Sequence, residues 1–276
     1  MNAESISKIL IKRKADAHKG DFGRALIICG SPLMPGAAII AAGAALRCGV
    51  GLVTVASGER VISACAAALP EAVYFDTSAE RNELIAAIKR ADAILIGCGL
   101  GQSEKSKYLL KTVLEYGECP LVIDADGINM VAGGIQLNEY AGEICLTPHA
   151  GEMGRLLSCD AAAVQADRSK AAFDCVSRYG VTTVLKGSGT ITAFKDGSSI
   201  VNTTGNAGMA KPGSGDMLGG MMVSLLAQGI EPQKAIPAAV YLHGMAGDIA
   251  AAEYTQRAMQ VSDMINVLPR VFKNFE

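Results

Sequence analysis

Short apolar runs alternate with longer amphipathic segments along most of this chain. The apolar runs are rich in Val, Ile and Leu and end in small or polar residues, a pattern typical of strands buried on both faces of a parallel sheet. The segments between them have the spacing of helices that cover such a sheet. The expected strands are 25–29, 52–56, 93–97, 121–124, 143–147 and 182–186, and the expected helices between them are 36–47, 59–69, 103–116, 128–132, 150–157 and 160–179.

In the last third of the chain the pattern changes. Two further β runs, 190–194 and 199–202, come after short Gly-containing turns, which predicts antiparallel hairpins at one edge of the sheet. Three helices are expected after them, at 215–227, 232–254 and 261–272. The whole pattern predicts an α/β fold with a mostly parallel, doubly wound sheet and an antiparallel edge. No linker or internal repeat interrupts it, so residues 1–276 are expected to form one domain.

Composition narrows the class of protein. The formal net charge is -2 and Trp is absent, so neither a nucleic-acid partner nor a membrane surface is expected. The eight cysteines are spread singly and form no Cys-x-x-Cys pair, which favours reduced thiols in the cytoplasm. The N-terminal residues lack the apolar stretch of a signal peptide, and the apolar windows are short for a membrane span. A soluble cytoplasmic protein is therefore expected.

The segment most informative about function is the Gly-rich stretch 206–216, which leads directly into an apolar helix. Glycines let backbone N–H groups approach a ligand closely, and the first N–H groups of a helix have no partner inside it. Gly213, Ser214 and Gly215 are therefore the expected anion hole, with phosphate as the most suitable anion. Asp216 would repel a phosphate, so we expect it to be a general base that takes a proton from a substrate hydroxyl.

Further polar groups follow the expected strands, where doubly wound sheets bind ligands. The Gly-rich segment 97–101 is equally consistent with a tight turn and with a ligand contact. Asp124, Asp126 and Asn129 either hold Mg²⁺ through water, or Asp126 caps a helix. We expect Glu152 to lie in the first turn of its helix, with a catalytic or metal role as the alternative.

Four other basic or titratable side chains are also candidates for function. Lys186 either neutralises a phosphate or is an exposed lysine of a hairpin, and Lys211, just before the anion hole, is expected to be functional. His149 is placed by the pattern in a loop at a strand end, a position typical of functional histidines. His243 lies in an apolar helix, and we expect a hydrogen-bonded or ligand-adjacent histidine rather than a catalyst.

Taken in order, these segments resemble the ribokinase-like superfamily and, within it, the ADP-dependent NAD(P)H-hydrate dehydratases. The likeness extends over nearly the whole chain, and its most specific element is Thr-Pro-His-Ala-Gly-Glu at 147–152 together with Gly-Ser-Gly-Asp at 213–216. Pro212 and Gly127 depart from the family, which often has Gly and Ala there; Pro212 removes one N–H donor. The segments that resemble the family are 18–23, 34–38, 97–101, 124–129, 146–152, 184–187, 206–216 and 239–244.

The resemblance implies a three-layer ribokinase-like sandwich and a metabolite-repair enzyme. Such an enzyme removes water from the (6S) hydrate of NADH or NADPH while ADP, or ATP in its place, serves as co-substrate; ADP becomes AMP and phosphate. It also implies Mg²⁺ as a cofactor, without assigned protein ligands, and a homotetramer. The residues it implicates are Ala38, Gly99, His149 and Asp216 for the substrate, Lys186, Gly187, Ser188, Gly189, Thr190 and Gly215 for the nucleotide, and Asp216 for catalysis.

Two other functions would use the same loop. A small-molecule kinase of this fold, acting on a vitamin precursor of the hydroxyethylthiazole or hydroxymethylpyrimidine type, needs the same anion hole and the same base. A nucleotide-sensing protein without turnover needs the anion hole but has no use for Asp216.

Overall fold

The computed structural model describes residues 1 and 3–275, and within them nine strands form one sheet. The strand order is β3-β2-β1-β4-β5-β6-β7-β8-β9; neighbours from β3 to β7 are parallel, and β8 and β9 are antiparallel to their neighbours. The order turns back between β1 and β4, where doubly wound sheets bind ligands. The strands are β1 Arg24–Ile28, β2 Leu52–Ser57, β3 Val73–Asp76, β4 Ala93–Ile96, β5 Leu121–Ile123, β6 Ile144–Leu146, β7 Thr182–Leu185, β8 Ile191–Ala193 and β9 Ser199–Val201.

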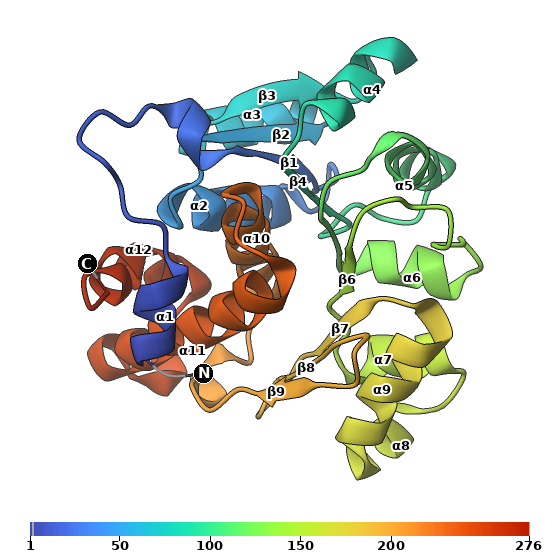
Figure 1. The fold of residues 1–276 in the computed structure, drawn as a ribbon. Helices are drawn as coiled ribbons and strands as arrows, with labels where there is room; N and C mark the ends of the chain where they lie inside the picture. Colours follow the sequence, from blue (N-terminus) through green and yellow to red (C-terminus); the bar gives the residue numbers. More distant parts are fainter. Residues whose placement is uncertain (2, 276) are drawn as a thin grey trace.

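Helices cover both faces of the sheet and give three layers (Figure 1). One buried core lies between the sheet and α2, α3, α10, α11 and α12, and a second lies between the sheet and α4 to α9. The helices are α1 Ala3–Ile9, α2 Pro35–Arg47, α3 Glu59–Ala68, α4 Arg81–Lys89, α5 Glu104–Tyr116, α6 Asp126–Ala132, α7 Ala150–Leu157, α8 Ala161–Ala166, α9 Arg168–Tyr179, α10 Ser214–Ala227, α11 Pro232–Ala258 and α12 Val261–Phe272, with short 3-10 turns η1 Lys19–Phe22 and η2 Ala207–Met209. Within the described part of the chain, no helix combines the length and the apolar character that crossing a membrane requires.

The predicted doubly wound sheet with its antiparallel edge is confirmed, and four details differ. The sequence pattern missed β3 and α4, and it missed α1 near the N-terminus. The single helix expected at 160–179 is two helices, because Asp167 has φ −144° and ψ 83° and its side chain caps α9 by accepting from the Lys170 N–H. An aspartate favours this capping conformation over the interior of a helix.

Gly220 allows α10 to lie against α2. A Cβ at Gly220 would stand 2.0 Å from the carbonyl oxygen of Ala41. Replacing Gly220 with alanine is expected to lower the free energy of unfolding by about 1–3 kcal/mol, because the two backbones must separate. Urea unfolding measures this loss. Gly219→Ala is the matched control: its Cβ would meet side chains and no backbone, with Leu95 Cδ1 at 3.0 Å and Cys98 Sγ at 3.8 Å, so equal losses in the two variants would contradict the account.

Candidate active site

The carboxyl ends of β4, β5, β6 and β7 meet at one edge of the sheet, and α10 begins above them. Gly215, in the first turn of α10, is the residue at which this helix comes close to the side chains at the strand ends. A Cβ there would lie 3.3 Å from Lys186 Nζ and 3.5 Å from Asp124 Oδ2. The sequence-predicted anion hole, Asp124 and Lys186 therefore form one site although they lie far apart in the chain.

Gly213 begins the helix in a conformation that only glycine adopts readily. Its φ is 93°, and a Cβ would stand 2.6 Å from Ile40 Cδ1. Ser214 N donates to the Lys211 carbonyl at 3.3 Å, so this N–H of the predicted anion hole is already engaged. Among the described residues nothing accepts from the N–H groups of Gly215 and Asp216. These two N–H groups lie at the positive end of the α10 dipole and are free to donate hydrogen bonds to a bound anion.

His243 of α11 packs against the same end of α10. Its Nε2 lies 3.4 Å from the Ser214 hydroxyl, and the histidine is 8 % exposed. Burial lowers the pKa of His243 to about 4, so the ring is neutral at physiological pH. The burial and the hydrogen bond agree with one of the two roles that the sequence predicted, and the other, a place next to a ligand, stays a prediction. Asp248, one turn further along α11, accepts from Gly205 N and Asn206 Nδ2 and fixes the loop that precedes the anion hole.

Lys186 occupies the floor of the site between two buried carboxylates. Its Nζ lies 2.5 Å from Asp124 Oδ1 and 3.7 Å from Glu152 Oε2, and the two acids are 2 % and 4 % exposed. Burial opposes the charge of Lys186, but Asp124 and then Glu152 outweigh it and raise the pKa of the lysine above its ordinary value. Lys186 is thus a charged part of the site, and neither an exposed hairpin lysine nor a free cation.

Asp216 is partly buried beside this network. Burial, and then the charge of Asp124, raises the pKa of Asp216 to about 6. A carboxylate with this pKa is ionised at neutral pH and is a stronger base than an ordinary aspartate. The raised pKa and the adjacent open N–H groups fit the role of general base that the sequence predicted.

Cys98 belongs to the site, although the sequence presents it only as one of eight singly spaced cysteines. Its Sγ lies 3.8 Å from Asp124 Oδ2, and the thiol also interacts with Asp216, where it acts against the rise in the pKa of that carboxyl. A hydrogen bond to Cys29, together with burial, holds the pKa of the Cys98 thiol well above its usual range, so it remains a neutral donor. The only signal in the sequence was its place inside the Gly-rich strand-end segment 97–101.

Neither interpretation of the Asp124–Asn129 segment is correct as stated. Asp126 does not cap α6: its Oδ2 accepts from Gly101 N at 2.8 Å and ties together two strand-end loops. Asn129 Oδ1 accepts from Arg155 Nε at 2.8 Å. With Asp124 paired to Lys186, these oxygens already have protein partners, and the residues do not fit a Mg²⁺ site. In the described part of the chain no group of three or more His, Cys, Asp or Glu side chains is arranged to hold a metal.

The predicted substrate residues lie near the same edge with different exposure. His149 is half-exposed, and its Nδ1 accepts from Gly151 N and Glu152 N at the start of α7. Glu152 closes this cap by accepting from His149 N, which confirms its place in the first helical turn. Gly99 packs against α2, where a Cβ would meet Ala37 at 2.7 Å. Ala38, next in α2, has no exposed surface, so a ligand would reach it only after its neighbours move.

The predicted nucleotide segment 186–190 is an exposed turn held at both ends. Thr190 Oγ1 donates to the Gly187 carbonyl, and Arg168 Nη2 donates to the Leu185 carbonyl. Gly187 through Gly189 are exposed and open to a ligand. Lys211 Nζ donates to the Arg257 carbonyl near the end of α11. A functional role for Lys211 stays a prediction.

The raised pKa of Asp216 predicts a stability change that does not depend on any substrate. The folded protein binds the Asp216 proton more tightly than the unfolded chain does, so the buried charge destabilises the fold above about pH 6 and not below pH 4. Asp216→Asn is expected to raise the free energy of unfolding at pH 8 by about 1–3 kcal/mol, with no gain at pH 4. Urea unfolding at the two pH values measures it. Asp196→Asn is the control, and its change in the free energy of unfolding at pH 8 should have the opposite sign, because hydrogen bonds from Ser198 lower the pKa of Asp196.

The sheet order, the helix that starts above the carboxyl ends of β4 to β7 and the carboxylate beside its first N–H groups define an α/β protein of the ribokinase-like class. Solved structures support this class: a hydroxyethylthiazole kinase from Pyrococcus horikoshii matches with a TM-score of 0.65 over 98 % of this chain and 95 % of the other, but at 15 % identity this likeness shows the fold alone. The NAD(P)H-hydrate dehydratase family model matches residues 25–270, and the chain belongs to that family.

Individual relatives agree with this assignment. A Bacillus subtilis protein described as ADP-dependent (S)-NAD(P)H-hydrate dehydratase is 34 % identical over 99 % of this chain and 97 % of its own length. The crystal structure of an ADP/ATP-dependent NAD(P)H-hydrate dehydratase from B. subtilis, co-crystallised with ATP and Mg²⁺, has a TM-score of 0.91 over 100 % of this chain and 98 % of the other. A bifunctional NAD(P)H-hydrate repair enzyme from Moorella thermoacetica is 39 % identical over 97 % of this chain. The chain spans only 52 % of that bifunctional relative.

Proposed function

We propose that this protein is a metabolite-repair enzyme that dehydrates the (6S) hydrate of NADH or NADPH and converts ADP to AMP and phosphate. The observation that supports this best is Asp216, whose carboxylate of raised pKa lies beside the open N–H groups at the start of α10. A site that only binds phosphate gains nothing from a carboxylate at this point, whereas a phosphoryl-transfer site needs a base there.

The chemistry follows from what each group does. Hydroxide is a poor leaving group and phosphate is a good one. Asp216 takes the proton of the ring hydroxyl as that oxygen attacks the β-phosphorus of ADP, and AMP leaves. The Gly215 and Asp216 N–H groups and the α10 dipole stabilise the charge on the moving phosphoryl group. The lone pair of the ring nitrogen then breaks the C–O bond, releases phosphate and, with loss of a ring proton, restores the dihydronicotinamide.

The binding residues are assigned within this proposal as the family resemblance implies. Ala38, Gly99 and His149 would contact the hydrated dinucleotide, and the exposed turn at 186–190 together with Gly215 would contact the adenine nucleotide. Of these, the half-exposed His149 and the open turn have the accessible surface that ligand binding requires. Mg²⁺ would arrive on the nucleotide phosphates, since the nearby carboxylates already have protein partners.

The compartment and assembly are also proposals. We place the enzyme in the cytoplasm as a homotetramer. All eight cysteines are free thiols, which suits a reducing compartment. The assembly rests on the family resemblance, and sedimentation equilibrium of the purified chain tests it.

The test of function compares two reactions of the same purified enzyme. We expect NADH absorbance to return when the (6S) hydrate of NADH is mixed with the enzyme and ADP, and one phosphate to be released for each NADH restored. Parallel reactions use ATP, the NADPH hydrate, or hydroxyethylthiazole with ATP. Phosphorylation of hydroxyethylthiazole without hydrate repair would establish the kinase alternative, and ADP binding without turnover on any substrate would establish a sensor.

A further inference from the structure

One stretch of the sheet lacks a covering helix, and the topology explains why. Right-handed crossovers place α2 and α3, which connect β1 to β2 and β2 to β3, on one face of the sheet. The crossover from β3 to β4 runs in the opposite direction, so α4 lies on the other face. Among the helices of the described residues, the nine-residue α4 is thus the one available there to cover three strands. Parallel sheets are normally buried on both faces.

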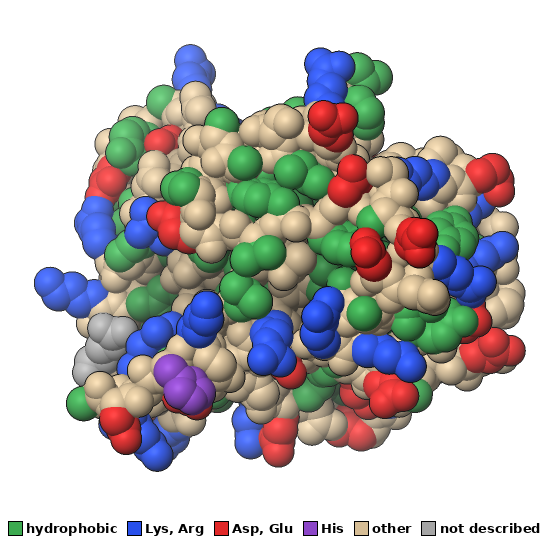
Figure 2. Space-filling model, turned by 90° about the horizontal axis from the view of Figure 1, so that it is seen from above, with side chains coloured by type: hydrophobic (Ala, Val, Ile, Leu, Met, Phe, Trp, Pro, Cys, Tyr) green, Lys and Arg blue, Asp and Glu red, His purple; other side chains and the backbone are tan. Residues whose placement is uncertain are grey.

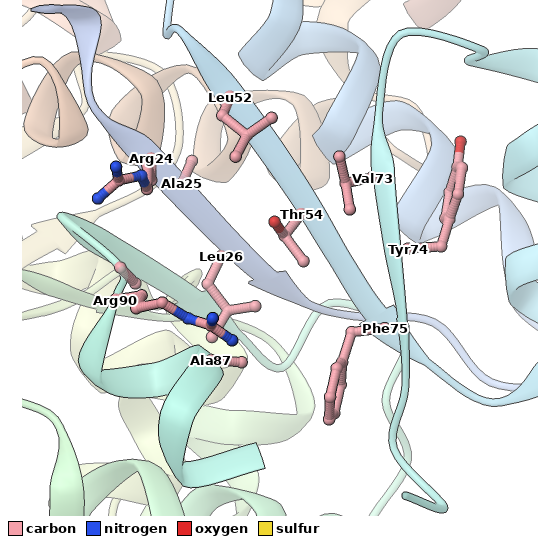
Figure 3. A pocket seen from close by; sticks show the side chains of 11 residues that line it. Arg24, Ala25, Leu26, Leu52, Thr54, Val73, Tyr74, Phe75, Ala87 and Arg90 are labelled. Atoms are coloured by element: carbon pink, nitrogen blue, oxygen red, sulfur yellow. The ribbon is translucent and has the colours of Figure 1, made fainter. Parts of the chain in front are cut away.

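The residues of β2 and β3 show the result. Leu52 and Thr54 are partly exposed while their neighbours Val53 and Val55 are fully buried, and Val73 is 47 % exposed. Together with Leu26, Phe75 and Ala87 they line a groove of about 430 Å³ between the strands and α4, which we call the edge groove (Figure 3). Its volume lies within the range of small-molecule sites. Figure 2, which views the molecule from above, shows hydrophobic side chains exposed between charged ones.

Two arginines give the edge groove a positive charge. Arg90, at the end of α4, extends into the groove in Figure 3, near Leu26 and Ala87. Its Nε donates to the Ala86 carbonyl at 3.1 Å, and no carboxylate pairs with its guanidinium among the described residues. Arg24 stands at the margin, and its side chain has no partner within the part of the chain that the structure describes; the nearby Asp92 accepts from the Arg24 backbone N–H. The remaining Arg90 N–H groups are a fork of the geometry that binds a carboxylate bidentately.

We propose that the edge groove is a binding site for a small amphipathic carboxylate. The Arg90 fork holds the carboxylate, Arg24 adds attraction, and an aromatic or aliphatic body lies on Leu26, Leu52 and Val73. The edge groove is lined by the first residues of β1, β2 and β3. The candidate active site, with Asp216, lies instead at the carboxyl ends of the strands. The proposal is therefore independent of the function proposed above.

Calorimetric titration with 4-phenylbutyrate tests this, and 4-phenylbutyramide is the uncharged control ligand. We expect one saturable site per chain for the carboxylate, with affinity at least about tenfold weaker for the amide, the value of one charge-assisted contact. Arg90→Gln should weaken phenylbutyrate binding about tenfold, and Arg90→Lys should restore only part of it, because a lysine lacks the fork. Arg60→Gln, an exposed arginine of α3 on the opposite face, is the matched control and should change nothing.

Each alternative outcome overturns the proposal. Equal binding of acid and amide would mean that the arginines do not recognise charge. Binding that survives Arg90→Gln and Arg24→Gln together would place the ligand elsewhere. Absence of binding, with Val73→Glu shifting the sedimentation coefficient to that of a smaller species, would assign the edge groove to a second copy of this chain. Absence of binding without such a shift would leave the arginines as solvated surface groups.

Discussion

Asp216→Asn is expected to lower the turnover of hydrate repair by ~10²–10⁴-fold, the usual loss when a general base is removed. The amide has nearly the same shape but cannot accept the hydroxyl proton. ADP should bind at least as tightly as before, because the variant removes a negative charge beside the open N–H groups of α10. Steady-state kinetics with the NADH hydrate measures the first effect, and calorimetric titration with ADP measures the second.

The wild-type enzyme provides an internal check on this assignment. Because the pKa of Asp216 is about 6, the fraction of ionised base falls below that pH, and kcat/KM should fall tenfold per pH unit at sufficiently low pH. Asp196→Asn, in an exposed turn, should leave the rate unchanged. Near-normal turnover in Asp216→Asn would reject the base role while leaving the anion site intact.

Lys186→Met is the second variant with a large expected effect, this time on stability. It leaves Asp124 and Glu152 buried without a counter-charge, and breaking a buried ion pair in this way typically lowers the free energy of unfolding by about 3–5 kcal/mol. Urea unfolding at pH 7 measures the loss. The double variant Lys186→Met/Asp124→Asn should recover part of it, because one of the two orphaned charges is removed.

The exposed pair Lys195–Glu143 is the matched control for this prediction. Both side chains are nearly half-exposed, so Lys195→Met should change stability by less than about 1 kcal/mol. A similarly small loss for Lys186→Met would mean that solvent reaches the floor of the site. The account would then lose its explanation for the raised pKa of Lys186.

Hydrophobic pattern was sufficient to predict the fold because most strands are buried on both faces and therefore read as continuous apolar runs. The exceptions have a common cause. β3 is an edge strand with four residues, none of them fully buried, and α4 buries only Leu84 and Ile88. Such elements leave a weak periodic signal. The break at Asp167 depends on a single side-chain cap, which periodicity does not detect.

The candidate site was predictable to the extent that it consists of local backbone geometry. The Gly-rich stretch before α10 predicts N–H groups without a protein acceptor, and Asp216 is adjacent to them in sequence. The partners of Lys186 could not be predicted in this way, because Asp124 and Glu152 come from two other strand ends and the pairing depends on tertiary packing. The same holds for Cys98, whose contacts with Asp124 and Asp216 join three separate segments.

The central claim is that the substrate hydroxyl attacks a phosphoryl group seated at the start of α10, with Asp216 as its base. Isotope tracing tests it most directly. The NADH hydrate is prepared with ¹⁸O in the ring hydroxyl and repaired with unlabelled ADP, and the released phosphate is analysed by mass spectrometry. The account predicts that the label is found in inorganic phosphate, one atom for each NADH restored. Label in water, with unlabelled phosphate, would show that the hydroxyl leaves without being phosphorylated and would contradict the account.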